Sequence, residues 1–272
     1  MKHKKISKSS AQLLAILNSK GRAWFSLQEA YSLFPSMSET HLRLQIKRMT
    51  DDGLLMHVGE GTYYVIPYDQ DAQTFIPDWH LLAEPLTGGE YYIGYYSALQ
   101  IHNLVTQPSL KEQIVVNKRI KPSQKTIKNI KFQFIFHNQK KFFGYKKTWV
   151  DNFNKVQCSD LEKTIIDCLY KPDYAGGIIE IGKAIHIARD RINYERLLEY
   201  AVKFGSQAVI KRLGYLLELL SIPTPITAEL LKLRTASITP LDTKLPAQGT
   251  ILSRWSILQN ADTETIKNAI AT

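Results

Sequence analysis

Six side chains near the N-terminus have the types and the spacing that read base pairs in duplex DNA. They are Thr40, His41, Arg43, Leu44, Lys47 and Arg48. With about 100° per residue, an α-helix places them on the side away from Leu42, Ile46 and Met49. Arginine and lysine reach guanine edges and phosphates, threonine offers a hydroxyl and a methyl group, and leucine can contact a thymine methyl group. We interpret the six as candidate DNA-binding residues; the alternative is a solvated amphipathic helix whose charges bind nothing.

A capping motif and the spacing of the apolar residues predict the helix that carries these residues. Ser36-Met37-Ser38-Glu39 matches the capping box, in which a serine hydroxyl accepts a free backbone N–H and the glutamate reaches back to another. We expect a helix over residues 38–52, closed by Gly53. A similar box, Ser26-Leu27-Gln28-Glu29, predicts a shorter helix that ends near residue 33.

A glycine-tipped hairpin follows the second helix. Residues 54–58 and 62–66 are β-prone runs joined by Gly59-Glu60-Gly61. An amphipathic segment over residues 10–19 precedes both helices and completes a three-helix core. This order of elements predicts a winged helix-turn-helix domain over residues 1–70. The tip of the wing is acidic, so its electrostatic contact with a DNA backbone is expected to be weak.

Most of the positive charge lies outside this domain. The formal net charge of the chain is +10, and residues 111–155 alone hold twelve basic and two acidic residues, an excess of the same size. Within this segment Phe132, Phe134 and Phe136 alternate with other residues, which predicts a strand of a basic sheet.

We interpret the basic sheet as a surface that attracts polyanions, with Tyr145 or Trp149 available to stack on nucleic acid. The residues assigned to this basic patch are Lys118, Arg119, Lys121, Lys140, Lys141, Lys146 and Lys147. The alternative is that the phenylalanines belong to the core and the lysines only keep the other face soluble.

Beyond residue 159 the pattern becomes helical. Ser159-Asp160-Leu161-Glu162 is a third capping box and predicts a helix to about residue 170. Three more helices are expected before residue 220, and a strand-like run occupies residues 251–258. Residues 71–272 are therefore predicted to form a larger mixed domain with a basic sheet and a C-terminal helical part, and the fold class of the chain is α+β.

Several kinds of chemistry have no matching pattern in the sequence. There is no zinc-binding CxxC or HExxH motif and no phosphate-binding loop, so we expect no metal and no cofactor. No apolar run is long enough to span a bilayer, and no signal peptide is apparent, so we expect a cytoplasmic protein without a membrane partner. Cys158 and Cys168 are expected on one helix, too far apart for a disulfide, as reduced apolar residues.

Two alternatives to DNA binding remain open. A protein-interaction module would use the basic sheet to bind an acidic partner. A metal-dependent nuclease would need a carboxylate set, and Pro172-Asp173 followed by Glu180-Ile181-Gly182-Lys183 has one residue too many for the usual Glu-x-Lys spacing. Asp160, Glu162 and Asp167 are a further carboxylate group, although acids at a helix start also favour the helix dipole. We expect no enzymatic activity.

Four motifs of the second domain resemble those of one family. They are Tyr95-Tyr96-Ser97-Ala98-Leu99-Gln100-Ile101-His102-Asn103-Leu104 with Gln107-Pro108, residues 159–167 with Pro172 and Ala175-Gly176-Gly177, Arg212-Leu213-Gly214-Tyr215-Leu216-Leu217-Glu218, and Pro240-Leu241 with Arg254-Trp255. In this order they resemble the AbiEi-type antitoxins, the regulators of abortive-infection type IV toxin–antitoxin systems. The resemblance covers nearly the whole chain.

The resemblance implies a two-domain transcriptional autorepressor and antitoxin of a phage-defence system. Its winged helix would bind inverted repeats in the double-stranded DNA of its own promoter. Its C-terminal domain would counteract a co-encoded nucleotidyltransferase toxin, without the need for a stable complex. By position alone, the implied recognition residues are Thr40, Arg43, Lys47 and Arg48.

Overall fold

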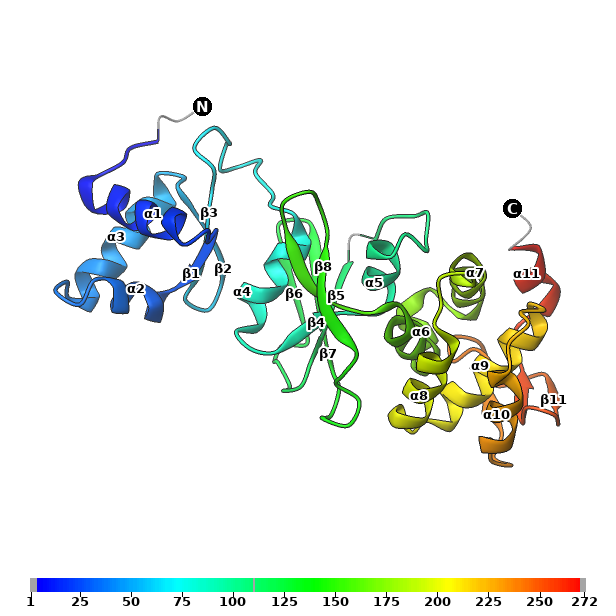
Figure 1. The fold of residues 1–272 in the computed structure, drawn as a ribbon. Helices are drawn as coiled ribbons and strands as arrows, with labels where there is room; N and C mark the ends of the chain where they lie inside the picture. Colours follow the sequence, from blue (N-terminus) through cyan, green and yellow to red (C-terminus); the bar gives the residue numbers. More distant parts are fainter. Residues whose placement is uncertain (1–3, 110, 270–272) are drawn as a thin grey trace. The chain divides into compact units, whose positions relative to one another are not determined.

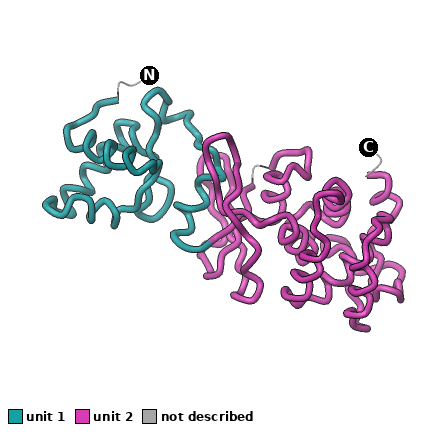
Figure 2. The backbone as a smooth tube through the Cα atoms, viewed as in Figure 1, with its two compact units in different colours: residues 1–90 teal, residues 91–272 magenta. Residues whose placement is uncertain are grey.

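The chain is a mixed α+β protein, as the sequence predicts. The computed structural model describes residues 4–109 and 111–269, and within them helices accompany three separate β-sheets (Figure 1). The chain divides into two compact units, residues 1–90 and residues 91–272 (Figure 2). In the described part of the chain, each helix is too short or too polar to cross a membrane.

Three helices of the first unit begin at serine caps. They are α1 (Lys8–Ser19), α2 (Leu27–Leu33) and α3 (Glu39–Asp51). The hydroxyl oxygens of Ser7, Ser26 and Ser38 each accept the backbone N–H of the residue three positions later, which satisfies a donor that the first turn leaves free. Gly53, at a φ of +74°, follows α3. The predicted helices are therefore confirmed, with two differences: α3 is capped by Ser38 and not by Ser36, the first residue of the predicted capping box, and α1 begins at Lys8, two residues before its predicted start.

A three-stranded antiparallel sheet completes the core of this unit. Its strands are β1 (Trp24–Ser26), β2 (Leu55–Gly59) and β3 (Thr62–Val65), in the order β1-β3-β2. The hairpin β2–β3 is the predicted one, whereas β1 was not predicted because its three residues form a strand only by pairing with β3. Leu42 and Ile46 of α3 pack in one buried cluster with Leu13 and Leu17 of α1.

The first unit extends further than its predicted end at residue 70. A short 3-10 helix, η1 (Trp79–Leu82), leads into α4 (Ala83–Thr87), and α4 contacts β1, β2 and β3. The division between the units therefore falls at residues 90 and 91. The helical turns of residues 79–87 are too short to show a period in the sequence.

A six-stranded mixed sheet opens the second unit. Its strands are β4 (Tyr91–Ile93), β5 (Lys111–Val116), β6 (Gln124–Ile127), β7 (Ile130–Phe136), β8 (Tyr145–Trp149) and β9 (Lys155–Ser159). The spatial order is β6-β7-β5-β4-β9-β8, so β6 and β8 form the two edges. β5 pairs in parallel with β7, and β4 pairs in parallel with β9.

A helical layer holds a large apolar cluster of the second unit. Its helices are α5 (Tyr95–Ile101), α6 (Leu161–Tyr170), η2 (Pro172–Ala175), α7 (Ile178–Ala188), α8 (Tyr194–Phe204), α9 (Gln207–Leu219) and α10 (Ile226–Leu233). α6 lies at the centre of this layer, because it contacts α5, α7, α8 and α9 (Figure 1). α5 precedes β5 in the chain, and the other helices follow β9. As the sequence predicts, the strands of the six-stranded sheet come before α6–α10 in the chain.

A small third sheet lies near the C-terminus. It consists of β10 (Thr239–Pro240), β11 (Thr250–Leu252) and β12 (Ile257–Gln259), in the order β10-β12-β11, and α11 (Thr263–Asn268) follows it. The strand expected over residues 251–258 is thus two short strands with a turn between them. Trp255, in this turn, is 1% exposed.

Two sequence predictions fail where the sheet passes into α6. Cys158 lies on β9, whereas Cys168 lies on α6, so the two thiols do not share a helix; both are buried and free. The N-cap of α6 is Asp160 rather than Ser159, since an Asp160 carboxylate oxygen accepts the Lys163 N–H at 2.9 Å. Only one residue separates β9 from α6, so no turn signal marks the end of the strand.

Candidate nucleic-acid interface

All six candidate DNA-binding residues lie on the exposed side of α3. Thr40, His41, Arg43, Leu44, Lys47 and Arg48 are exposed. On the opposite side, Leu42, Ile46 and Met49 are at most 1% exposed. The amphipathic pattern thus holds α3 in the core by one face and leaves the other face, including a 46% exposed Leu44, available to a partner.

The cations of this face have no acidic partner among the described residues. Arg43 approaches the ring of Tyr31 on α2, with 5.8 Å between guanidinium and ring centre. In the part of the chain that the structure describes, Arg43, Lys47 and Arg48 form no ion pair. Their charges therefore remain free to meet phosphates or base edges.

One edge of the α3 face borders a hollow of about 340 Å³. His41, Leu44 and Arg48 line it together with Lys5 and the cap of α1. Gln45, also in its wall, is 6% exposed, and its side-chain amide has no hydrogen-bond partner among the described residues. The wall also contains the acid Asp52 beside the cations Lys5 and Arg48, so the hollow is polar and suits a hydrogen-bonding group more than an apolar one.

The β2–β3 turn is anchored inside the unit and has an exposed acidic tip at Glu60. The carbonyl oxygen of Gly61 accepts the N–H of Leu27 at 2.6 Å, which ties the turn to the start of α2. Gly61 has a φ of +62°, a conformation that favours glycine.

The basic residues of the second unit form separate groups rather than one patch. Lys118, Arg119 and Lys121 lie between β5 and β6, Lys140 and Lys141 follow β7, and Lys146 and Lys147 lie on β8. The first group lies in the connection from β5 to the edge strand β6, whereas the last lies on the opposite edge strand, β8, so the two groups belong to different parts of the sheet.

Some of these basic residues also have partners within the unit. The Lys141 ammonium lies 3.9 Å from the ring centre of Tyr170, and the Arg119 guanidinium lies 4.6 Å from that of Phe136. In the predicted aromatic strand, Phe132 and Phe134 are buried and Phe136 is 37% exposed. Phe132 and Phe134 therefore belong to the core, as the alternative interpretation of the aromatic strand expects, whereas Phe136 is exposed.

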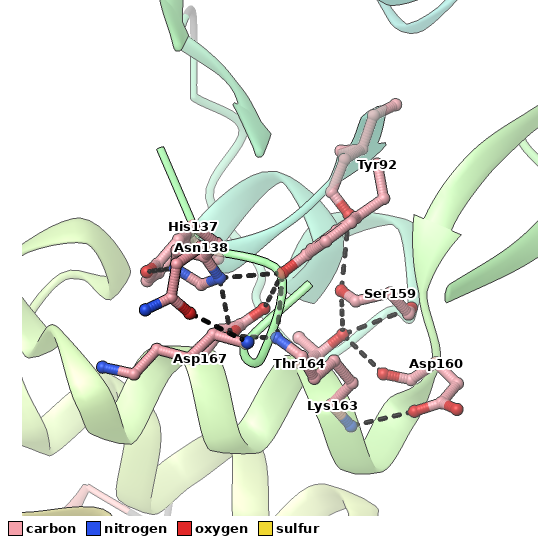
Figure 3. A network of polar contacts seen from close by, with 11 residues as sticks. Tyr92, His137, Asn138, Ser159, Asp160, Lys163, Thr164 and Asp167 are labelled. Carbon is pink, nitrogen blue, oxygen red and sulfur yellow. Dashed lines mark hydrogen bonds and ion pairs between the residues drawn. The ribbon is translucent and has the colours of Figure 1, made fainter. Parts of the chain in front are cut away.

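Beneath the sheet, a buried polar network joins three distant parts of the second unit (Figure 3). Lys163 and Asp167, one turn apart on α6, form an ion pair with no exposed surface. The Tyr92 hydroxyl donates to the Asp167 carboxylate at 3.0 Å and accepts from the Lys163 ammonium at 2.8 Å. His137, after β7, lies 3.1 Å from the same hydroxyl through Nδ1.

The network is satisfied when His137 is neutral. Tyr95 lies 2.8 Å from Nε2 of His137 and can donate to it, while Nδ1–H of His137 donates to Tyr92. Burial lowers the pKa of His137 to about 4, although Asp167 opposes this shift. Burial also lowers the pKa of Lys163 and raises those of Tyr92 and Tyr95 well above the usual value.

This network was not predicted from the sequence. Its members are up to 75 positions apart along the chain. One local feature of the sequence points to it: Lys163 and Asp167 lie four positions apart among the apolar residues of a helix. Buried charges at such positions need a partner. In the described residues the network has no opening to solvent, so it anchors α6 to the sheet.

The carboxylates considered for a nuclease have other partners. Asp160 caps α6 and accepts from the Tyr200 hydroxyl at 3.0 Å, Glu162 accepts the N–H of Asn193 at 2.8 Å, and Asp167 pairs with Lys163. Among residues 4–109 and 111–269, no group of three or more acidic, histidine or cysteine side chains is arranged to hold a metal ion.

Two of the four motifs that carry the family resemblance, residues 212–218 and Pro240 with Trp255, meet in space. The Arg212 guanidinium, 1% exposed, donates to the carbonyl oxygens of Pro240 and Leu169 at 2.8 and 2.6 Å. The Trp255 indole N–H donates to Glu218 at 2.6 Å. These motif residues therefore hold the helical layer to the small C-terminal sheet.

Comparison with known proteins gives a likeness of fold. No protein-family model matches the sequence, and no curated protein matches it. Among solved structures, the chain is similar to the Rv2827c protein from Mycobacterium tuberculosis, with a TM-score of 0.70 and 13% sequence identity. The similarity covers 100% of this chain and 97% of that one. At this level of identity the likeness concerns the fold alone.

Proposed function

We propose that the first unit contains a winged helix-turn-helix and that the protein binds duplex DNA with α3 in the major groove. The observation that carries this proposal is the exposed face of α3, on which Arg43, Lys47 and Arg48 have no ion-pair partner among the described residues. A helix of this width fits the major groove, where such side chains distinguish base pairs. Because Glu60 gives the hairpin an acidic tip, the wing contributes little to the attraction.

A gel-shift experiment with a labelled fragment from upstream of the gene tests this proposal. The protein should shift the fragment, and the double variant Arg43→Ala/Lys47→Ala should lose the shift while its circular dichroism spectrum is unchanged. The matched control is Lys20→Ala/Lys232→Ala, which removes the same charge from exposed positions outside α3. Equal DNA binding by both double variants would show that α3 does not contact the DNA bases.

The resemblance to AbiEi-type antitoxins supports a more specific role. We infer that the protein represses its own operon through inverted repeats in the promoter and that its second unit counteracts a nucleotidyltransferase toxin encoded beside it. In this role the chain is a regulator and not an enzyme, and it acts in the cytoplasm.

Co-expression with the neighbouring gene tests the antitoxin role. If that gene encodes a toxic nucleotidyltransferase, the full chain should restore growth. The Arg43→Ala/Lys47→Ala variant should restore it equally, because the inferred antitoxin activity lies in the second unit. Growth arrest that persists with the full chain would refute the antitoxin role but would leave DNA binding untouched.

A further inference from the structure

The β8–β9 hairpin carries an aromatic and basic surface that the proposed function does not use. Trp149, at the end of β8, is 56% exposed, and Phe153, in the turn, is 88% exposed. Trp149 is paired with Lys155 across the hairpin, and the Lys155 ammonium lies 4.2 Å from its ring centre. Lys147, two residues before Trp149, shares the same face of the strand.

The charge of this hairpin is unbalanced. Between residues 145 and 159 the basic residues are Lys146, Lys147 and Lys155, and Asp151 is the one acid. Asp151 is committed to the turn, because its carboxylate accepts the N–H groups of Phe153 and Asn154, both at 2.6 Å. The three lysines form no ion pair in the described part of the chain. Three lysines against one carboxylate give the hairpin a net charge of +2, which attracts a polyanion.

The hairpin also lies where a long ligand can reach it. β8 is an edge of the six-stranded sheet, so within residues 4–109 and 111–269 no further strand pairs with its outer side. On one face of the hairpin Lys147 precedes Trp149 by two residues and Lys155 lies opposite it, so cations and an aromatic ring lie side by side, the two kinds of group that bind phosphates and bases. Bases in a duplex already stack on each other, so an exposed ring selects unpaired bases.

We propose that this hairpin binds single-stranded nucleic acid, with bases stacked on Trp149 and Phe153 and phosphates held by Lys147 and Lys155. The flanking cations lie on the same face as Trp149, and hence the surface is not a continuous apolar patch of the kind that enters a lipid bilayer. This site is separate from the duplex-binding face of α3 and does not depend on it.

Anisotropy of a labelled oligo(dT) strand measures the stacking contribution. Base stacking is worth roughly fivefold or more in affinity for each ring, so the loss of both rings in Trp149→Ala/Phe153→Ala should weaken binding by at least about 25-fold. Ile187→Ala/Ile251→Ala is the matched control, because both isoleucines are exposed apolar residues of the same unit. This control should bind as the wild type does.

The salt dependence separates the stacking rings from the cations. For single strands the logarithm of affinity falls with the logarithm of salt concentration by about 0.7 for each neutralised phosphate. Lys147→Ala should lower this slope by about 0.7, whereas Trp149→Ala should leave it unchanged. A Lys147→Ala variant with the wild-type slope would contradict the assignment of a phosphate to this lysine.

Two further results would overturn the proposal. One is loss of oligo(dT) binding in Arg43→Ala/Lys47→Ala, which would place the single strand on α3. The other is binding of the wild type to anionic phospholipid vesicles but not to oligo(dT), with the vesicle binding lost in Trp149→Ala/Phe153→Ala. Retained oligo(dT) binding in a variant that no longer shifts duplex DNA would support two independent sites.

Discussion

At the scale of single residues, the second unit depends on charges that are kept away from water. Lys163 and Asp167 have no exposed surface, and they are balanced by each other, by Tyr92 and by a neutral His137. A buried pair of this kind costs desolvation energy, and it persists only when every remaining donor and acceptor is satisfied. The network therefore fixes how α6 docks on the sheet.

The depressed pKa of His137 predicts that stability falls in mild acid. The pKa is about 4 in the folded protein and 6.5 in the unfolded chain. Between these values the unfolded state binds more protons, so the stabilisation is complete above pH 6.5 and is lost as the pH falls through 4. Its size is about 3 kcal/mol. Urea unfolding from pH 7.5 down to about pH 4 measures it.

The control for this prediction is His137→Gln, which keeps hydrogen-bonding groups but does not titrate. Its free energy of unfolding should be lower at neutral pH and should depend less steeply on pH between 6.5 and 4. Parallel curves for the variant and the wild type would show that other groups cause the acid sensitivity.

At the scale of elements, α9 and the small C-terminal sheet fit each other through one glycine. A Cβ atom on Gly214 would lie 2.1 Å from the ring of Trp255, closer than packed atoms can approach. The same ring is held by its hydrogen bond to Glu218, one turn further along α9. Gly214 is thus required by packing, not by backbone conformation.

Gly214→Ala should therefore destabilise the protein although alanine favours a helix. Overpacking of this kind costs about 1–3 kcal/mol, which outweighs the gain of about 1 kcal/mol in helix propensity. Gly214→Ala combined with Trp255→Phe should be less destabilised than the sum of the two single variants, because the smaller ring leaves space for the methyl group. Thermal unfolding of the four proteins gives this comparison, and strict additivity would contradict it.

Elements with local signals are predictable from the sequence, whereas elements that depend on distant contacts are not. The capping residues and the spacing of apolar residues predict α2 and α3, because both signals are local in the chain. The same signals predict which residues lie on the exposed face of α3. β1 has no such signal, since its three residues are a strand only through β3. The helix assignment of Cys158 fails because β9 leads into α6 without a turn signal. The network of Tyr92, His137 and Lys163 depends on contacts across the whole unit.

At the scale of the whole molecule, the charge and the candidate recognition helix lie in different units. Residues 1–70 have an excess of three basic residues, whereas residues 111–155 hold an excess of ten. The first unit ends at residue 90 because α4 packs on its sheet. We therefore expect sequence selection from α3 and a separate electrostatic contribution from the second unit.

The central claim is that α3 selects a DNA sequence, and a specificity ratio tests it most directly. Anisotropy titrations at one salt concentration would compare a duplex from upstream of the gene with a shuffled duplex of the same length and composition. The upstream duplex should bind at least roughly a thousandfold more tightly, and Arg43→Ala/Lys47→Ala should remove the preference. Equal affinity of the wild-type protein for the two duplexes would contradict the account.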